Sequence, residues 1–362
     1  MSDRRAARQR TVAAALPGIG ADALIVTHLP NIRWLTGFTG SAGVLVISED
    51  HATLITDFRY ETQAAAEVGG AATVLIERAN LWDRLKRWFE STPPFSAVAY
   101  ESHATTVRDA ERLPTVVNRA LVAAVELVEG FRQVKDDDEV AAIVAAAALA
   151  QESLAETIET IRPGDREIDI AARLESALRH RGSQWHPFQT IVASGPRSAL
   201  PHARSSEKAI ARGEFLLIDF GAQVDGYCSD ITRTFAVGAP DGRQREIYEI
   251  VRQAQARAIA GLHSGLTGRE GDALARDLIA ARGHGPEFGH SLGHGLGLEV
   301  HEAPRLAVTA EAILPAGTVV TVEPGIYLAG WGGVRIEDDV WLTPEGGTLL
   351  SDGHTELIIL DT

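Results

Sequence analysis

The sequence FLLIDFGAQVDGYCSDITRTF, residues 215–235, sets two aspartates among apolar residues. Asp219 ends the run 215–218 as a carboxylate at the end of a buried strand would. Asp230 follows the turn at Gly226 and opens the strand-like run 231–235. Because a buried carboxylate is costly unless it is paired or bound to a metal, both aspartates are candidate metal ligands.

Three further segments downstream contain similar candidates. His294 lies in the glycine-rich passage 289–295, and Glu323 ends the β-branched run 318–322 before a Pro-Gly pair. Glu337 closes a short apolar run two residues after Arg335. Four carboxylates and one imidazole balance two divalent cations that share a bridging hydroxide, and this donor set favours Mn, Co, Fe or Zn.

The remaining chain predicts two domains. Residues 1–128 alternate short apolar runs with helical segments, as a small α/β domain does, and residues 129–136 read as a linker. Residues 137–362 read as helix pair, strands, helix pair, strands, which is a weak internal duplication. The glycine-rich stretch 36–43 lacks the ending of a phosphate loop and predicts a turn, and Asp136 is expected to cap a helix.

The four ligand segments, in this order, resemble those of the pita-bread metallopeptidases, which include methionine aminopeptidase, prolidase and aminopeptidase P. Residues 1–128 resemble the amino-terminal domain of the proline-specific branch. The resemblance implies an α+β pita-bread catalytic domain at 137–362, with pseudo-duplicated helix pairs on a curved antiparallel sheet. A smaller α/β creatinase-type domain is expected to precede it. The resemblance also implies two metal ions, with Mn²⁺ expected and Co²⁺ or Zn²⁺ as alternatives, and a homodimer.

The same resemblance suggests a role for each residue of the site. The metal ligands are expected to be Asp219, Asp230, His294, Glu323 and Glu337. Glu323 would also carry the proton, and with His202 and His301 it forms the expected catalytic set. The expected substrate-binding residues are His202, His290, His301, Tyr327 and Arg335, although Tyr327 also fits core packing and Arg335 also fits pairing with a ligand carboxylate.

The implied activity is hydrolysis of the bond between an amino-terminal residue and a following proline, with the bridging hydroxide as nucleophile. The segment 31–41 looks more like aminopeptidase P than classical prolidase, so we expect an Xaa-Pro aminopeptidase acting on peptides with proline in second position. An Xaa-Pro dipeptidase is the alternative. A non-catalytic binding protein or a metal-free creatinase-like hydrolase would not need all five ligands.

Composition narrows the function further. The chain has 362 residues, a net charge of −15 and one cysteine, Cys228, which we expect to be structural. A surplus of acidic residues argues against a nucleic-acid partner. The start of the chain has no apolar signal core, and the longest apolar run, residues 141–150, is too short to span a bilayer. We therefore expect a cytoplasmic enzyme without a membrane partner.

Overall fold

The computed structural model describes residues 4–92 and 94–360, and the chain forms two compact units that meet between Arg132 and Gln133. This division falls inside the segment 129–136, which we propose as the linker. Residues 129–132 of that segment belong to the helix α6 (Leu127–Arg132) of the first unit.

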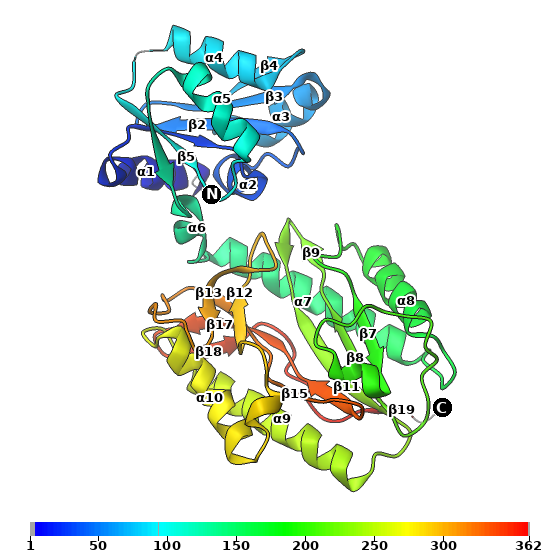
Figure 1. The fold of residues 1–362 in the computed structure, drawn as a ribbon. Helices are drawn as coiled ribbons and strands as arrows, with labels where there is room; N and C mark the ends of the chain where they lie inside the picture. Colours follow the sequence, from blue (N-terminus) through cyan, green and yellow to red (C-terminus); the bar gives the residue numbers. More distant parts are fainter. Residues whose placement is uncertain (1–3, 93, 361–362) are drawn as a thin grey trace. The chain divides into compact units, whose positions relative to one another are not determined.

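Within residues 4–92 and 94–132, the first unit is a mixed six-stranded sheet in the order β4-β3-β2-β1-β5-β6 with helices on both faces (Figure 1). Its strands are β1 (Ala23–Val26), β2 (Gly43–Ser48), β3 (Ala52–Asp57), β4 (Thr73–Glu77), β5 (Ala97–Glu101) and β6 (Ala120–Ala124). Its helices are α1 (Arg4–Ala15), α2 (Leu29–Thr36), α3 (Glu61–Val68), α4 (Leu81–Ser91), α5 (Val107–Val117) and α6 (Leu127–Arg132). The predicted turn at 36–43 is confirmed, since α2 ends at Gly37 with φ of 82° and a strand follows.

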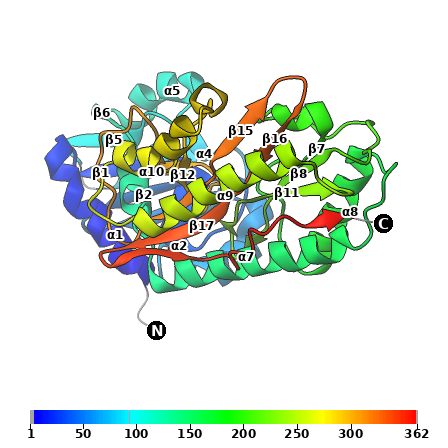
Figure 2. The same ribbon diagram turned by 90° about the horizontal axis from the view of Figure 1, so that it is seen from below.

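The second unit consists of two helix pairs with strands between them. The pairs are α7 (Asp137–Ile158) with α8 (Glu167–His180), and α9 (Gly242–Gly261) with α10 (Gly268–Ala281). Asp136 caps α7 through a reciprocal bond with Glu139, as predicted. Figure 1 shows the strands between the two pairs, and the view from below in Figure 2 shows α7 and α9 running the length of the unit.

The strands of the second unit form two larger sheets and two hairpins in the described residues. One sheet has the order β19-β11-β8-β7, and the other has the order β13-β12-β14-β17-β18. The strands of the first are β7 (Ile191–Ser194), β8 (Phe215–Phe220), β11 (Ile231–Val237) and β19 (Ile359–Leu360). The strands of the second are β12 (Gly293–Gly295), β13 (Glu302–Leu306), β14 (Val319–Val322), β17 (Asp338–Thr343) and β18 (Gly346–Leu349). The hairpins are β9 (Gln223–Val224) with β10 (Tyr227–Cys228), and β15 (Gly325–Leu328) with β16 (Gly332–Arg335).

Each helix pair buries an apolar face against one half of the strands. Between α7, α8 and the first sheet the core contains small residues on α7 and large ones on α8 and the strands: Ala146, Ala147, Ala150, Ile170, Leu174, Ile218, Phe220, Ile231 and Phe235. Between α9, α10 and the other strands it contains Val251, Ala254, Ala275, Ile279, Val320, Val322, Ile326 and Val340. This duplicated arrangement is the predicted pita-bread architecture, which is confirmed.

Among the described residues, one helix, α7, is long and apolar enough to cross a membrane, by length and composition alone. Its apolar face nevertheless lies in the core just described. Its exposed face carries Glu152 and Glu156, which pair with Arg181 at 3.0 and 2.9 Å. A helix with one face in the core and paired charges on the other is a core helix of this unit.

One stretch of the second unit is not a continuous strand. Residues 332–343 divide into β16 and β17, with Ile336 and Glu337 between the two strands. The interruption has a physical cause, because the backbone N–H of Glu337 donates to the carbonyl of Thr232 in β11. Glu337 therefore sits at a crossing between the two strand systems, with its side chain directed into the site.

Candidate metal centre

The five predicted ligands come from five different places in the second unit. Asp219 lies near the end of β8, and Asp230 immediately precedes β11, the antiparallel partner of β8. His294 is the central residue of β12, Glu323 follows β14 and Glu337 lies between β16 and β17. Strand ends suit this task because apolar neighbours fix the backbone while the next side chain projects from the edge.

The structure brings these side chains together. Asp230, His294 and Glu337 each offer a ligand atom within 4.8 Å of the others, in the described part of the chain. His294 Nε2 lies 3.7 Å from Asp230 Oδ2 and 3.5 Å from Glu323 Oε1. Asp219 faces the same cavity. All five are thus neighbours in space, although their residue numbers span more than a hundred positions.

Hydrogen bonds to neighbouring side chains hold the carboxylates in place. The Thr232 hydroxyl donates to Glu337 Oε2 at 2.6 Å and accepts from Arg335 Nε at 2.9 Å. Arg335 Nη2 also donates to Asp219 Oδ2 at 2.5 Å. Arg335 therefore pairs with a predicted ligand, which is one of the two roles expected for it, while its side chain also lines the cavity.

Burial and mutual repulsion raise the pKa values of the carboxylates in this group. Burial and the carboxylate of Glu337 raise the pKa of Asp230 well above its ordinary value, and burial raises the pKa of Glu323 to about 8. Burial and then Glu323 also raise the pKa of Glu337. Burial and His301 lower the pKa of His294 to about 4, so its imidazole is neutral and able to bind a metal at pH 7.

Divalent cations fit these residues. Among the described residues, Asp219 Oδ1 is buried and makes no hydrogen bond, although its partner atom Oδ2 is paired with Arg335. A carboxylate oxygen left without a partner in a buried site is explained if it faces a cation. A cation among the carboxylates would also reverse the unfavourable charge balance, and the donors are those that Mn²⁺, Co²⁺ and Zn²⁺ accept.

A cavity of about 890 Å³ opens onto the ligands. Apart from the five ligands, the predicted residues on its wall are His202, His290, His301 and Arg335. The rings of His294 and His301 lie with centroids 4.3 Å apart. Tyr327 is placed behind this wall: its hydroxyl lies 2.8 Å from His290 Nε2 and accepts from Arg335 Nη1 at 3.0 Å.

Sequence reasoning missed several residues of the site. Thr232 and Thr321 hold predicted ligands in place. Thr232 donates to Glu337, and Thr321 accepts from the backbone N–H of His294 at 3.1 Å and donates to Glu323 at 3.3 Å. Both threonines stand two residues from a ligand, a spacing that places side chains on one face of a strand and so could have identified them. Other wall residues, including Phe188, Gln189, Arg204 and Arg305, carry no local signal of this kind.

Cys228 lies outside the cavity wall, in a small apolar cluster with Ile143, Leu296 and Val319. Burial raises the pKa of its thiol to about 12, so the thiolate form that binds metals is disfavoured at neutral pH. Cys228 therefore packs as a small apolar residue.

Comparison with known proteins supports the fold and assigns both units to known families. Residues 141–344 match the model of metallopeptidase family M24, and residues 8–134 match that of the creatinase/prolidase N-terminal domain. An uncharacterized peptidase of Bacillus subtilis, YqhT, is 44% identical, over 94% of this chain and 97% of its own.

Two solved structures are similar over nearly the whole chain. An Xaa-Pro dipeptidase from Bacillus anthracis is 42% identical with a TM-score of 0.94, covering 98% of this chain and 99% of its own. An X-Pro aminopeptidase from Thermotoga maritima is 37% identical with a TM-score of 0.90, covering 97% and 99%. The predicted resemblance to the pita-bread metallopeptidases, in the branch with the prolidase amino-terminal domain, is confirmed.

Proposed function

The chain belongs to metallopeptidase family M24, and we propose that it hydrolyses the peptide bond between an amino-terminal residue and a following proline. The observation that carries the proposal is the convergence of the five predicted ligands on one cavity with His202, His290 and His301. The two solved relatives, named as an Xaa-Pro dipeptidase and an X-Pro aminopeptidase, support the choice of proline.

Bound at Asp219, Asp230, His294, Glu323 and Glu337, two divalent cations would supply Lewis acidity and lower the pKa of a water molecule. Mn²⁺ is the metal we propose. The protein's own part begins with Glu323, whose carboxylate takes the proton of the attacking water and returns it to the leaving nitrogen.

The imidazoles on the cavity wall would act on the substrate. His202 and His301 are proposed to donate hydrogen bonds to the carbonyl oxygen as negative charge develops on it. Burial lowers the pKa of His301, so at neutral pH its ring is an uncharged donor. His290 is fixed by the Tyr327 hydroxyl and offers a second contact to the peptide. The free amino group would lie against the carboxylate ligands, which restricts cleavage to the end of a chain.

Two substrate ranges share this chemistry. An Xaa-Pro aminopeptidase, the activity predicted from residues 31–41, accepts longer peptides, whereas an Xaa-Pro dipeptidase accepts only dipeptides. The second candidate is favoured by the higher identity and TM-score of the relative that is named a dipeptidase. We also propose that the enzyme is cytoplasmic and that it forms a homodimer. Sedimentation of the purified chain would test the oligomeric state.

Product analysis by mass spectrometry distinguishes these candidates. The chain is incubated with an X-Pro dipeptide, an X-Pro-Z tripeptide and an X-Ala dipeptide, each with Mn²⁺ and again after chelation. Metal-dependent release of Pro-Z supports the aminopeptidase, and cleavage of the X-Pro dipeptide alone supports the dipeptidase. If neither proline peptide is cleaved while metal analysis shows bound Mn²⁺, the proposed function is wrong.

A matched pair of variants separates the site from the rest of the surface. Glu323→Gln keeps the side-chain shape but removes the proton acceptor, so turnover should fall by at least about 100-fold, the scale of general acid–base catalysis. Glu246→Gln makes the same change on the exposed face of α9 and should leave turnover unchanged. Equal activity of the two variants would contradict the role of Glu323.

A further inference from the structure

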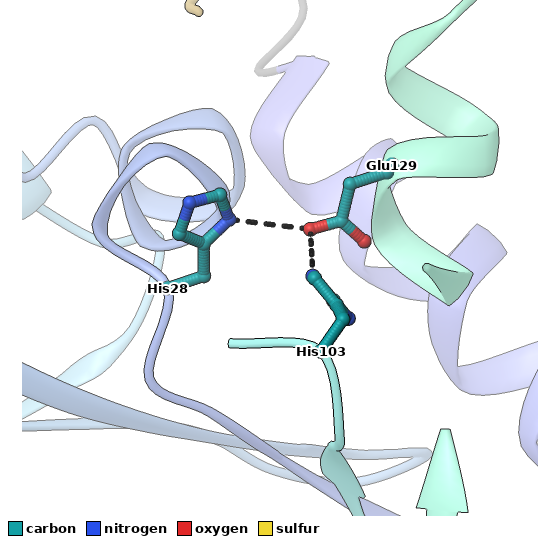
Figure 3. A group of neighbouring side chains, drawn as sticks. All are labelled: His28, His103 and Glu129. Carbon is teal, nitrogen blue, oxygen red and sulfur yellow. Dashed lines mark hydrogen bonds and ion pairs between the residues drawn. The ribbon is translucent and has the colours of Figure 1, made fainter. Parts of the chain in front are cut away.

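A group of side chains of the kinds that bind metals lies in the first unit, whereas the cavity described above is lined by residues of the second unit. His28 directly precedes α2, His103 follows β5 and Glu129 lies in α6. His28 Nδ1 is 3.2 Å and His103 Nε2 is 2.9 Å from the same oxygen, Glu129 Oε1. Figure 3 shows both imidazoles directed at this carboxylate from different segments of the chain.

The spacing of the three groups is that of ligands around one ion. Two donor atoms bound at about 2.1 Å, with angles between those of octahedral and tetrahedral sites, lie about 3.0–3.4 Å apart. The two measured distances to Glu129 fall close to this range, and the three ligand atoms lie within 4.8 Å of one another. A small inward movement of the two rings, which stand perpendicular with centroids 6.0 Å apart, would complete the arrangement.

The two oxygens of the Glu129 carboxylate differ in their hydrogen bonding, and this is a second, independent observation that points to a ligand. Glu129 Oε1 takes both imidazole contacts and a hydrogen bond from Asn31 Nδ2. Glu129 Oε2 is buried and, among the residues that the structure describes, accepts no hydrogen bond. A cation held by both oxygens of the carboxylate would give the second oxygen a partner.

Surrounding hydrogen bonds hold the carboxylate in a fixed orientation. Asn31 Nδ2 also donates to Glu101 Oε1 at 2.6 Å, and Arg132 Nη1 donates to Asn31 Oδ1 at 2.6 Å. Glu101 Oε2 accepts from the backbone N–H of His28 at 2.8 Å, which fixes the segment that carries this imidazole. Outer hydrogen bonds of this kind are what orient the ligands of protein metal sites.

From this geometry we propose that His28, His103 and Glu129 bind one divalent transition-metal ion, with water completing its coordination. Two imidazoles and a carboxylate are the donors that Zn²⁺ accepts, and Co²⁺ accepts them also. Binding moves the proton of His103 from Nε2 to Nδ1 and gives up the 3.4 Å contact of Nδ1 with the backbone N–H of Glu126. The ion fastens α6, the last element of the first unit, to the segments before α2 and after β5.

This proposal does not rest on the peptidase activity, and the test is arranged to keep the two apart. The full-length chain carries His294→Ala and Glu337→Ala, which disable the catalytic centre, and is freed of metal by chelation. It is then titrated with Zn²⁺ by calorimetry and with Co²⁺ by absorption spectroscopy. We expect one ion per chain from the first unit, with the visible bands of Co²⁺ bound to nitrogen and oxygen.

Adding His103→Ala or Glu129→Gln to this background should weaken Zn²⁺ binding at least tenfold and abolish the Co²⁺ bands. Glu129→Gln retains the side-chain shape, so we expect this variant to fold, which circular dichroism checks. The test therefore still works if His103→Ala is unstable. His51→Ala is the matched control, because this imidazole belongs to the same unit but packs against Trp88. The proposal would be overturned if Zn²⁺ binds more weakly than at micromolar concentration, or if all variants bind it with equal affinity. The three side chains would then be a hydrogen-bonded cluster without a metal.

Discussion

Thr232→Val should weaken metal binding at the candidate centre while the surrounding strands keep their positions. Thr232 is fully buried in β11, and its hydroxyl joins Glu337 Oε2 at 2.6 Å to Arg335 Nε at 2.9 Å. Valine has nearly the same shape but lacks the hydroxyl. The substitution therefore removes two hydrogen bonds to charged groups and adds no bulk.

The expected losses of stability and of metal affinity follow from the two charged groups that the Thr232 hydroxyl contacts. A hydrogen bond to a charged group contributes about 1.5–3 kcal/mol, so the free energy of unfolding should fall by at least that amount. Loss of a hydrogen bond that orients a ligand typically lowers metal affinity by about 10–100-fold. Because Glu337 loses its donor, the same range is expected here, which corresponds to about 1.4–2.7 kcal/mol of binding free energy.

Thr234→Val provides a matched control two residues along the same strand. Thr234 is also buried, and its hydroxyl donates to the carbonyl of Arg335 at 2.9 Å and accepts from the N–H of Arg335 at 3.2 Å. Both of its partners are backbone groups. Its loss should lower the free energy of unfolding without changing the affinity for metal.

Isothermal titration with Mn²⁺ measures the affinity of the wild type and of both variants, and urea unfolding in chelator measures their stability. We expect a larger dissociation constant for Thr232→Val alone. Two outcomes would refute this: both variants bind Mn²⁺ with the wild-type affinity, or both lose affinity equally. In either case the Thr232 hydroxyl does not orient a metal ligand, and the assignment of Glu337 as a metal ligand must be abandoned.

Three further predictions concern the fold around the two sites. Gly293→Ala places a Cβ against a backbone carbonyl of β14 and should cost about 1–3 kcal/mol or more in urea unfolding, whereas Gly289→Ala, with nothing nearby, should be neutral within about 0.5 kcal/mol. Lys135→Met removes the cation that lies 3.1 Å from the buried Glu302 carboxylate and should cost about 3–5 kcal/mol, most of which a second change, Glu302→Leu, should restore. Finally, burial raises the pKa of Glu129, but hydrogen bonds from neighbouring side chains outweigh it and lower the pKa to about 2 from 4.5. The stability from this shift is present above pH 4.5 and lost as the pH falls towards 2, so in thermal melts between pH 7 and 3 the stability of Glu129→Gln should depend less on pH; parallel curves would contradict this.

Local patterns that the sequence carries directly were predicted correctly. The carboxylates at 219 and 323 stand at the ends of apolar runs that form β8 and β14, and Asp136 begins α7. These features depend on a few neighbouring residues, since strand formation and helix capping are decided within a short stretch of the sequence. The roles of the ligand side chains remain predictions that metal titration will test.

Several elements of the first unit have weaker patterns. α1 is rich in arginine and alanine and, within its described length, buries Val12, so it presents little of the apolar stripe that predicts a helix. The short helix α2 begins with Leu29-Pro30 and is followed directly by the glycine turn. Both helices are fixed by packing on the sheet, a contribution that periodicity does not contain.

The sequence alone determined the family, the order of the ligand segments and the positions of the strand ends that bear them, because each is written in contiguous residues. Tertiary structure decided which distant groups meet. The pairing of β8 with β11 sets Asp219 opposite Thr232, and the break before β17 turns Glu337 towards them. The cluster of His28, His103 and Glu129 likewise joins segments far apart in the chain. Strand register and helix packing are non-local, so such contacts appear only when the whole chain has folded.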